Sequence, residues 1–156
     1  MIPAATAGTL ETGSGQVMAQ PGLDTCNCFA VRKAARRMTQ IYDAALAPSG
    51  VRVTQFMLLM ALNKEGGLSV NRLAELMVMN RTTMGKNLRP LERDGLVDVR
   101  VSKEDRRSRD ILLTRKGRSL LDKAYPLWRN AHDSFEQKHG ARFAEQFRSV
   151  LSAVTG

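Results

Sequence analysis

The chain has 156 residues, which suits one domain with a hydrophobic core. Its 24 Lys and Arg outnumber its 15 Asp and Glu, which gives a net charge of +9. This excess indicates an anionic partner, with nucleic acid as the leading candidate and an anionic membrane surface as the rival. No run approaches the roughly 18 apolar residues of a membrane-spanning helix, and two cysteines are too few for a disulfide framework.

Residues 1–25 are rich in Gly, Ala and Thr and contain no Lys or Arg. This composition predicts a flexible N-terminal arm and argues against a signal peptide, which needs a basic start and an apolar segment. Because no spanning segment follows either, we expect a soluble, cytoplasmic protein that makes no membrane contact.

Two helices are predicted after the arm. Apolar residues recur at a spacing of three to four over residues 26–46, and the Ala-Pro-Ser-Gly sequence at 47–50 ends this first helix. A second helix follows, with Thr54 as its N-terminal cap and Gly66-Gly67 as its stop.

A short third helix is predicted to begin at Ser69, and a fourth helix to run from a cap at Asn80 to about Asp94. The fourth helix carries apolar residues at positions i, i+4 and i+7, which predicts one buried face. These residues are Met84, Leu88 and Leu91.

Alternating apolar residues over 96–101 and an apolar run at 111–113 predict a β-hairpin, and the polar residues 102–109 are expected to project from its tip. Two more helices are predicted over about 115–138 and 141–154. Their aromatic residues are most simply explained by packing against a second subunit, although an intramolecular core is the alternative. These aromatic residues are Trp128, Phe135, Phe143 and Phe147.

The fourth helix places polar and basic residues opposite its apolar face. Because residues near the start of a recognition helix reach base edges, Thr82, Thr83 and Lys86 are predicted to read bases. Arg81 and Arg89 are predicted to hold phosphates. A merely solvated helix face is the alternative, and a second basic cluster in the hairpin argues against it.

The hairpin cluster consists of Asp105, Arg106, Arg107 and Arg109. An arginine at a loop tip suits the narrow, electronegative minor groove of A/T-rich DNA, and an acidic neighbour can orient its guanidinium. The predicted fold class is therefore mainly α with a small β-hairpin wing: a winged helix-turn-helix with a helical dimerisation region. We expect one domain over 26–156, with residues 51–114 as the DNA-binding part and 26–50 and 115–156 as dimerisation helices.

Three segments carry a resemblance to a known family: residues 80–95, 105–109 and 113–118. Together they resemble the MarR/SlyA family of bacterial transcription regulators. The resemblance implies a two-fold homodimer joined by its terminal helices and bound to a double-stranded, pseudo-palindromic operator, usually as a repressor. It also implies that a small molecule, or oxidation, releases the DNA. The family's Asp-X-Arg wing motif falls on Asp105 and Arg107, so Arg107 is the implied minor-groove residue, with Arg106 as the alternative.

The first helix is partly similar to that of the OhrR branch of this family, which senses organic hydroperoxides through a cysteine. The similarity implies a sensing role for Cys28, with Tyr42 as its partner. A second tyrosine of the branch would fall where this chain has Arg32. Cys26 is a candidate to resolve an oxidised Cys28. The alternative is that Cys28 is a small apolar residue buried at a dimer interface.

The other effector class that the resemblance implies is a small aromatic or acyl ligand, bound between the dimer helices and the DNA-binding part. A carboxylate of such a ligand would meet Arg32 or Arg36, although Met-rich helix faces are more often ordinary core. The candidate lining residues are Phe29, Arg32, Arg36, Phe56, Met57, Met60 and Trp128.

An enzyme is not expected, because the sequence has no glycine-rich phosphate loop and no nucleophile paired with a base. No cofactor or metal site is predicted either, and His132 and His139 are interpreted as solvated surface residues. Two further functional classes stay open: non-specific coating of DNA, which predicts a steep salt dependence without sequence preference, and a protein-interaction module.

Overall fold

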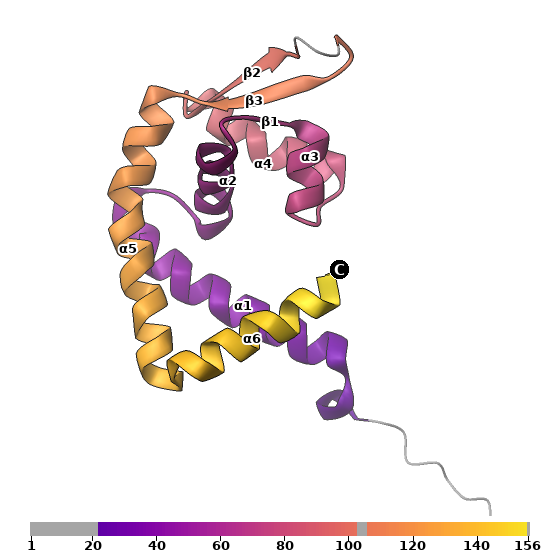
Figure 1. The fold of residues 1–156 in the computed structure, drawn as a ribbon, viewed down its shortest axis with the longest axis vertical. Coiled ribbons are helices and arrows are strands. Elements are labelled where there is room, and N and C mark those ends of the chain that lie inside the picture. The colour runs from indigo at the N-terminus through magenta and orange to yellow at the C-terminus, as the bar shows by residue number, and fades with distance from the viewer. Residues whose placement is uncertain (1–21, 103–105, 156) are drawn as a thin grey trace, which may run out of the picture. The chain divides into compact units, whose positions relative to one another are not determined.

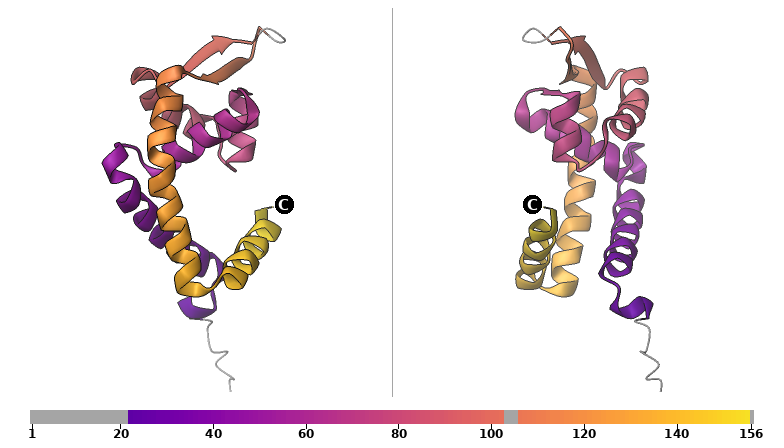
Figure 2. Two further views of the ribbon diagram at one scale, coloured as in Figure 1. Left: turned by 60° about the vertical axis from the view of Figure 1, so that its left-hand side comes forward. Right: turned by 90° about the vertical axis from the view of Figure 1, so that its right-hand side faces the viewer.

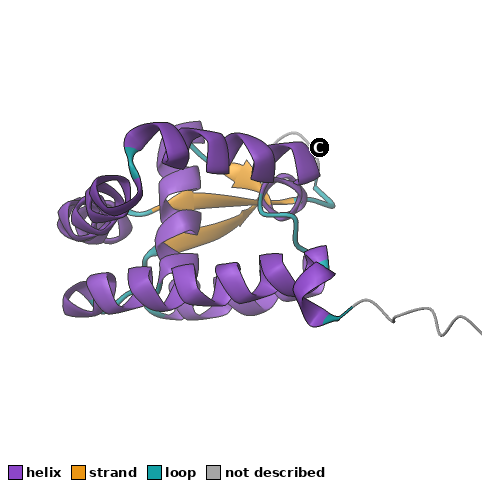
Figure 3. Ribbon diagram, turned by 90° about the horizontal axis from the view of Figure 1, so that it is seen from below, coloured by secondary structure: helices purple, strands orange, loops and turns teal. Residues whose placement is uncertain are grey.

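Helices form most of the described chain, together with one small antiparallel sheet (Figure 3). The structure, a computed structural model, describes residues 22–102 and 106–155. Only residues 22–25 of the predicted arm fall within this range, and Leu23–Thr25 form a 3-10 turn there. The predicted fold class, mainly α with a small β wing, is confirmed, and the dimerisation role of the terminal helices stays a prediction.

The chain divides into two compact units, residues 1–34 and 35–156, and each is described by itself. Helix α1 (Asn27–Leu46) contains the division. The expected bounds, an arm over residues 1–25 and one domain over 26–156, stay a prediction. The second unit continues with a 3-10 turn (Ala47–Ser49), α2 (Val53–Glu65), β1 (Leu68–Ser69), α3 (Val70–Leu76), α4 (Arg81–Arg93), β2 (Val97–Val101), β3 (Arg109–Leu113), α5 (Arg115–His139) and α6 (Ala141–Thr155).

The core of the second unit lies between α2, α3, α4, α5 and the sheet (Figure 1). Each of these elements contributes at least one fully or almost fully buried apolar side chain, such as Phe56 from α2 and Ile111 from β3. Burial of one such side chain stabilises the fold by roughly 1.5–3 kcal/mol. Helix α5 extends away from this core, and α6 turns back at its far end (Figure 2).

The start of α2 corrects one prediction. The helix begins at Val53, so Thr54 lies inside its first turn and is not the cap. The carboxylate of Asp43, ten residues earlier, accepts the backbone N–H of Val53 at 2.7 Å. The side chain of Gln55, inside the first turn, also accepts the backbone N–H of Arg52 at 3.0 Å. The start of α2 is thus held partly by an acceptor from another helix, which local sequence patterns do not reveal.

The sheet corrects two further predictions. A third strand, β1, pairs with β3 through Leu68 opposite Ile111, and a strand of two residues is too short to show alternation. Arg109 was placed in the projecting loop, but it is the first residue of β3 and lies opposite Val101. The pairing of β2 with β3 extends into the predicted loop 102–109. The side chain of Arg109 is exposed there, so it can join the strand while its charge remains solvated.

Candidate nucleic-acid interface

Helix α4 separates its apolar and polar residues cleanly. Met84, Leu88 and Leu91 are 0%, 5% and 0% exposed, as the sequence predicts. The side chain of Asn80 caps the helix by accepting the backbone N–H of Thr83 at 2.8 Å, which is also as predicted. The core thus fixes one face of the helix and leaves the opposite face to solvent.

The exposed face of α4 contains all five residues of this helix that were predicted to contact DNA. The five exposed residues are Arg81, Thr82, Thr83, Lys86 and Arg89. Within the described residues, no ion pair involves Lys86 or Arg89. Both side chains are therefore available to an anionic ligand without loss of a salt bridge.

Arg93, at the end of the same face, is paired differently. Its guanidinium donates to the carboxylate of Asp94 at 2.9 Å. This hydrogen bond lowers the pKa of Asp94 and raises the pKa of Arg93. Because the pair neutralises the Arg93 charge locally, the net positive charge of the face lies towards the start of the helix.

The turn between α3 and α4 contains an unusual backbone conformation. Val78 has a φ of 51°, in the left-handed region that β-branched residues rarely adopt. Its side chain is 73% exposed, so burial does not offset the strain. Backbone hydrogen bonds on both sides hold the turn, from Val78 to the Glu75 carbonyl and from Met79 to the Ala74 carbonyl. This conformation was not predicted, because nothing in the residue type of Val78 signals a positive φ.

Helix α5 is joined to the end of α4 by two side chains whose contacts were not predicted. The ammonium group of Lys116 donates to the carbonyl of Asp94 at 2.7 Å. The hydroxyl of Thr114 donates to the carbonyl of Gly95 at 2.8 Å and accepts the backbone N–H of Gly117. The start of α5 therefore fixes the position at which α4 ends.

Gly117 is required at this junction. A Cβ atom at this position would lie 2.1 Å from the carbonyl oxygen of Leu96 and 2.7 Å from a methyl group of Leu113. Only glycine allows α5 to approach the backbone between α4 and β2 so closely. The sequence analysis named residues 113–118 only as part of a family resemblance, and the close contact of Gly117 with the Leu96 carbonyl was not predicted.

The wing brings Arg106, Arg107 and Arg109 to the end of the β2–β3 hairpin. All three residues are exposed, and the backbone N–H of Ser102 donates to the carbonyl of Ser108 at 3.0 Å to close the pairing. Asp105, predicted to orient an arginine, lies outside the described residues. The roles of these wing residues stay predictions.

The predicted redox residues fall in both units. Cys26 and Cys28 belong to the first unit, and both are exposed free thiols. The Cys26 sulfur accepts the backbone N–H of Phe29 at 3.5 Å, at the start of α1. Tyr42 belongs to the second unit, where burial raises its pKa against the opposing effect of Arg148. The sensing role of Cys28 and the alternative that it is buried at a dimer interface both stay predictions.

The predicted effector residues are also divided. Phe29 and Arg32 lie in the first unit, and the others lie in the second. Phe56 is fully buried, and its ring stacks on Trp128 with centroids 5.9 Å apart. Trp128 therefore packs within its own chain rather than depending on a second subunit. Arg36 and Met57 are exposed and Met60 is half-buried, so a ligand role for this set stays a prediction.

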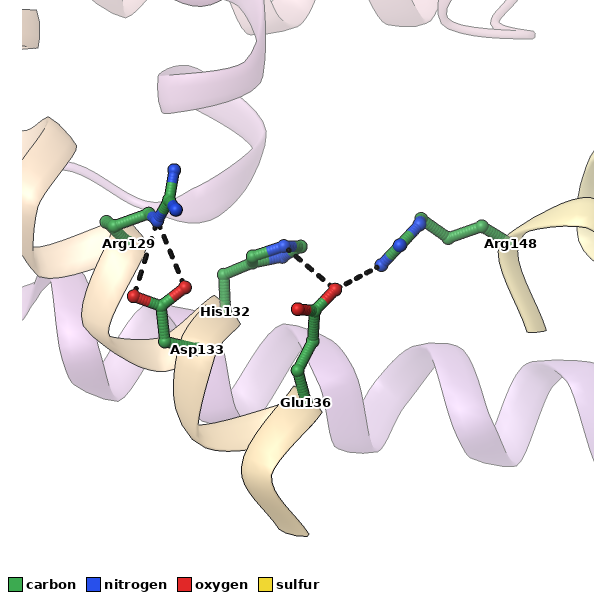
Figure 4. Close-up of polar contacts among 5 residues, drawn as sticks. All are labelled: Arg129, His132, Asp133, Glu136 and Arg148. Atoms are coloured by element: carbon green, nitrogen blue, oxygen red, sulfur yellow. Dashed lines mark hydrogen bonds and ion pairs between the residues drawn. The ribbon is translucent and has the colours of Figure 1, made fainter. Parts of the chain in front are cut away.

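A chain of polar contacts links α5 to α6 (Figure 4). The Glu136 carboxylate lies 3.1 Å from the guanidinium of Arg148 and 3.4 Å from Nε2 of His132. The ring of His132 stacks on Trp128 with centroids 5.1 Å apart. His132 is thus a half-buried packing residue, and the prediction that it is a solvated surface residue is wrong.

No group of three or more metal-binding side chains comes together among residues 22–102 and 106–155. Across the same residues, no single helix is long and apolar enough to cross a membrane.

The three-stranded sheet, the capped and exposed helix α4 and the arginine-bearing hairpin define a winged helix-turn-helix protein. The model of the MarR family matches residues 49–108. The chain is 37% identical to the Mycobacterium tuberculosis transcriptional regulator MosR, whose structure was solved in complex with DNA. That likeness covers 83% of this chain and 96% of MosR, with a TM-score of 0.73. The chain belongs to the MarR family.

Two further relatives are transcriptional regulators by name. TtmR of Methylorubrum extorquens is 34% identical over 113 residues, which cover 69% of this chain and 58% of TtmR. The organic hydroperoxide resistance transcriptional regulator of Bacillus subtilis is 31% identical over 97 residues, which cover 62% of this chain and 66% of that protein. The matched stretch thus spans less than two thirds of either relative.

Proposed function

We propose that the protein is a homodimeric, sequence-specific transcriptional regulator that binds a pseudo-palindromic operator, acts as a repressor and is released by a small-molecule effector. The observation that carries this proposal is helix α4, which buries its three apolar residues and exposes Thr82, Lys86 and Arg89. A helix held in this way presents donors and methyl groups to the major groove. The DNA complex of MosR, a relative at 37% identity, supports the same use of the fold. The protein has no catalytic role in this proposal.

The predicted DNA-contacting residues are assigned to different parts of the duplex. Thr82, Thr83 and Lys86, near the start of α4, contact base edges, and Lys86 engages the O6 and N7 atoms of a guanine. Arg81 and Arg89 hold phosphates. The wing places Arg107 in the adjacent minor groove, with Arg106 and Arg109 beside it and Asp105 orienting the guanidinium.

Dimerisation supplies a second copy of α4, which binds the second half-site of the operator. Helix α6 leaves Phe143, Val150 and Val154 between 48% and 74% exposed. Apolar side chains so exposed on one helix are expected to be covered by a second copy of the chain. Two copies of α4 are then expected about 34–36 Å apart, one turn of DNA.

The proposal is tested by fluorescence anisotropy with the duplex upstream of the protein's own gene and a scrambled duplex of equal length. We expect a preference of at least about a thousandfold for the specific duplex at physiological salt. Equal affinities that fall steeply with salt would identify a non-specific DNA-coating protein instead. Absence of DNA binding would leave a protein-interaction module.

A second candidate mechanism of release is oxidation of a thiol. The observation that favours it is that Cys26 and Cys28 are both exposed and free. The likeness to the Bacillus subtilis regulator, named for organic hydroperoxide resistance, supports it as well. Treatment with cumene hydroperoxide is then expected to abolish operator binding, with recovery on addition of thiol. A Cys28→Ser variant that responds like the unmodified protein would exclude Cys28 as the sensor and point to Cys26. Operator binding that is unchanged by the oxidant in the unmodified protein would leave the small-molecule effector.

A further inference from the structure

Helix α4 contains one glycine, Gly85, between the buried Met84 and the exposed Lys86. Glycine inside a helix is less favourable than alanine, because its backbone loses more conformational freedom on folding. A fold commonly requires glycine for one of two reasons, which are a left-handed backbone conformation and a lack of space for a side chain.

Neither reason applies to Gly85. Its backbone is helical, whereas glycines that end helices, such as Gly66 and Gly95, have a φ of 74° and 68°. A Cβ atom at Gly85 would meet no atom of the described chain within 4 Å, in contrast to the 2.1 Å approach at Gly117. The fold would therefore accept alanine at position 85, and alanine is the better helix former.

The open position lies among the side chains assigned to DNA. Residues three or four positions apart are neighbours on a helix surface, so Gly85 lies next to Arg81, Thr82 and Arg89, which are all exposed. Arg81, Gly85 and Arg89 follow one another at intervals of four residues, along a line about 12 Å long. The missing side chain at its middle leaves the helix backbone uncovered between the two arginines.

A DNA strand that is held by both arginines crosses α4 at this uncovered position. Arg81 and Arg89 are assigned to phosphates in the proposed function, so the sugar–phosphate backbone between those phosphates passes over Gly85. Without a Cβ atom, the helix backbone can lie closer to that strand. Glu92, three residues after Arg89, is exposed and repels phosphate, which restricts this contact to the part of α4 before it.

We propose that Gly85 is the point at which the sugar–phosphate backbone of the operator contacts α4, and that the missing side chain sets how deeply the helix enters the major groove. This contact rests on the proposed function and deepens it. One substitution, Gly85→Ala, is then expected to stabilise the free protein and to weaken its complex with DNA. A role of Gly85 in the fold alone would not combine these two effects.

The stability of the free protein tests whether the fold needs the glycine. Gly85→Ala is expected to raise the melting temperature by about 1–4 °C, because alanine is favoured inside a helix. Differential scanning calorimetry at equal protein concentrations measures the shift. A lower melting temperature would show that the fold itself requires glycine at this position and would overturn the proposal.

Fluorescence anisotropy with the duplex upstream of the protein's own gene tests the contact. We expect the affinity to fall about tenfold in Gly85→Ala and at least about a hundredfold in Gly85→Leu, because a larger side chain holds the strand further from the helix. Ser119→Leu, at an exposed position of α5, is the control and is expected to leave the affinity unchanged.

Two results of this series would overturn the contact. Equal losses in Gly85→Ala and Gly85→Leu would indicate a need for helix flexibility, because alanine and leucine are both good helix formers. A loss in Ser119→Leu as large as that in Gly85→Leu would indicate a general effect of added apolar surface.

Duplexes substituted at single base pairs distinguish the DNA backbone from the bases. Gly85→Ala is expected to lose affinity by the same factor for each duplex, because the sugar–phosphate backbone is common to all of them. A changed preference at one base pair would place a base edge over Gly85 and overturn the assignment.

Failure of this contact can be told from failure of the proposed function. Equal binding of the specific duplex by the unmodified protein and Gly85→Ala would overturn the contact and leave the function intact. An unmodified protein without preference for the specific duplex over a scrambled one would refute the proposed function, and the Gly85 contact with it.

Discussion

Helices α4 and α6 are both amphipathic, yet they use their apolar residues in opposite ways. Helix α4 buries Met84, Leu88 and Leu91 to 5% exposure or less. Helix α6 buries only Ala144 among its described residues and leaves Phe143 and Val150 48% and 65% exposed. The apolar face of α4 is therefore buried by its own chain, whereas that of α6 remains largely exposed.

This difference indicates the kind of partner that each helix meets. The free face of α4 is polar and basic, which suits an anion with many hydrogen-bonding groups. The free face of α6 is apolar, and contact with another protein surface would remove it from water. In the proposed function, α4 therefore contacts DNA and α6 contacts a second copy of the chain.

The largest expected effect is on stability, from the buried face of α4. Leu91→Ala is expected to lower the free energy of unfolding by about 2–5 kcal/mol, because it leaves a cavity in the core. The measurement is urea denaturation at several protein concentrations. Ala in place of the exposed Ser149 of α6, which lies off the apolar face of that helix, is the control, with an expected change within about 0.5 kcal/mol. Similar losses in both variants would show that the loss does not arise from the buried face of α4.

The next effect concerns the apolar face of α6. Phe143→Asp is expected to raise the dissociation constant of the dimer at least about tenfold, because a carboxylate in an apolar interface is costly to desolvate. Analytical ultracentrifugation measures the dissociation constant, and circular dichroism checks that the helices remain. A dimer of unchanged affinity would place the subunit contact elsewhere.

A third prediction concerns the wing. Arg107→Ala is expected to weaken operator binding roughly ten- to a hundredfold, because a guanidinium in the minor groove is lost, while the dimer stays intact. Lys64→Ala, an exposed charge at the end of α2, is the matched control. Unchanged operator affinity in Arg107→Ala would mean that another wing residue enters the groove.

A fourth prediction concerns base reading by α4. Lys86→Ala is expected to weaken operator binding about tenfold and to relax the base preference at one position of each half-site. Binding to a set of operators substituted at single positions measures both effects. An equal loss for every sequence would show that Lys86 contacts phosphate only.

The smallest expected effect is at the turn before α4. Val78→Asn is expected to raise the free energy of unfolding by about 1 kcal/mol, because asparagine tolerates the left-handed conformation better than a β-branched residue does. Thermal and urea denaturation of the variant are compared with the unmodified protein. A loss of stability would show that the exposed Val78 side chain makes a contact that outweighs the strain.

The features that sequence patterns predicted well are local. The period of Met84, Leu88 and Leu91 and the cap at Asn80 fixed the place of α4 and its buried face, because both depend on neighbouring residues in the chain. The contact of Asp43 with the start of α2 joins residues ten positions apart, and no local pattern contains it.

The features that sequence patterns missed depend on distant parts of the chain. Lys116 was part of a recognised motif, but its hydrogen bond to the Asp94 carbonyl joins residues 22 positions apart. The need for glycine at 117 arises from the Leu96 carbonyl, which a pattern centred on α5 does not include. The strain at Val78 follows from the tertiary geometry of the turn and not from its residue type.

The central claim is that two copies of α4 read one operator, held together by an apolar contact between subunits. A hydroxyl-radical footprint on the duplex upstream of the protein's own gene tests it most directly. The account predicts two protected half-sites with centres about 10–10.5 base pairs apart and outer protection by the wings. Uniform protection along the duplex, or one isolated half-site at concentrations where the protein is dimeric, would contradict it.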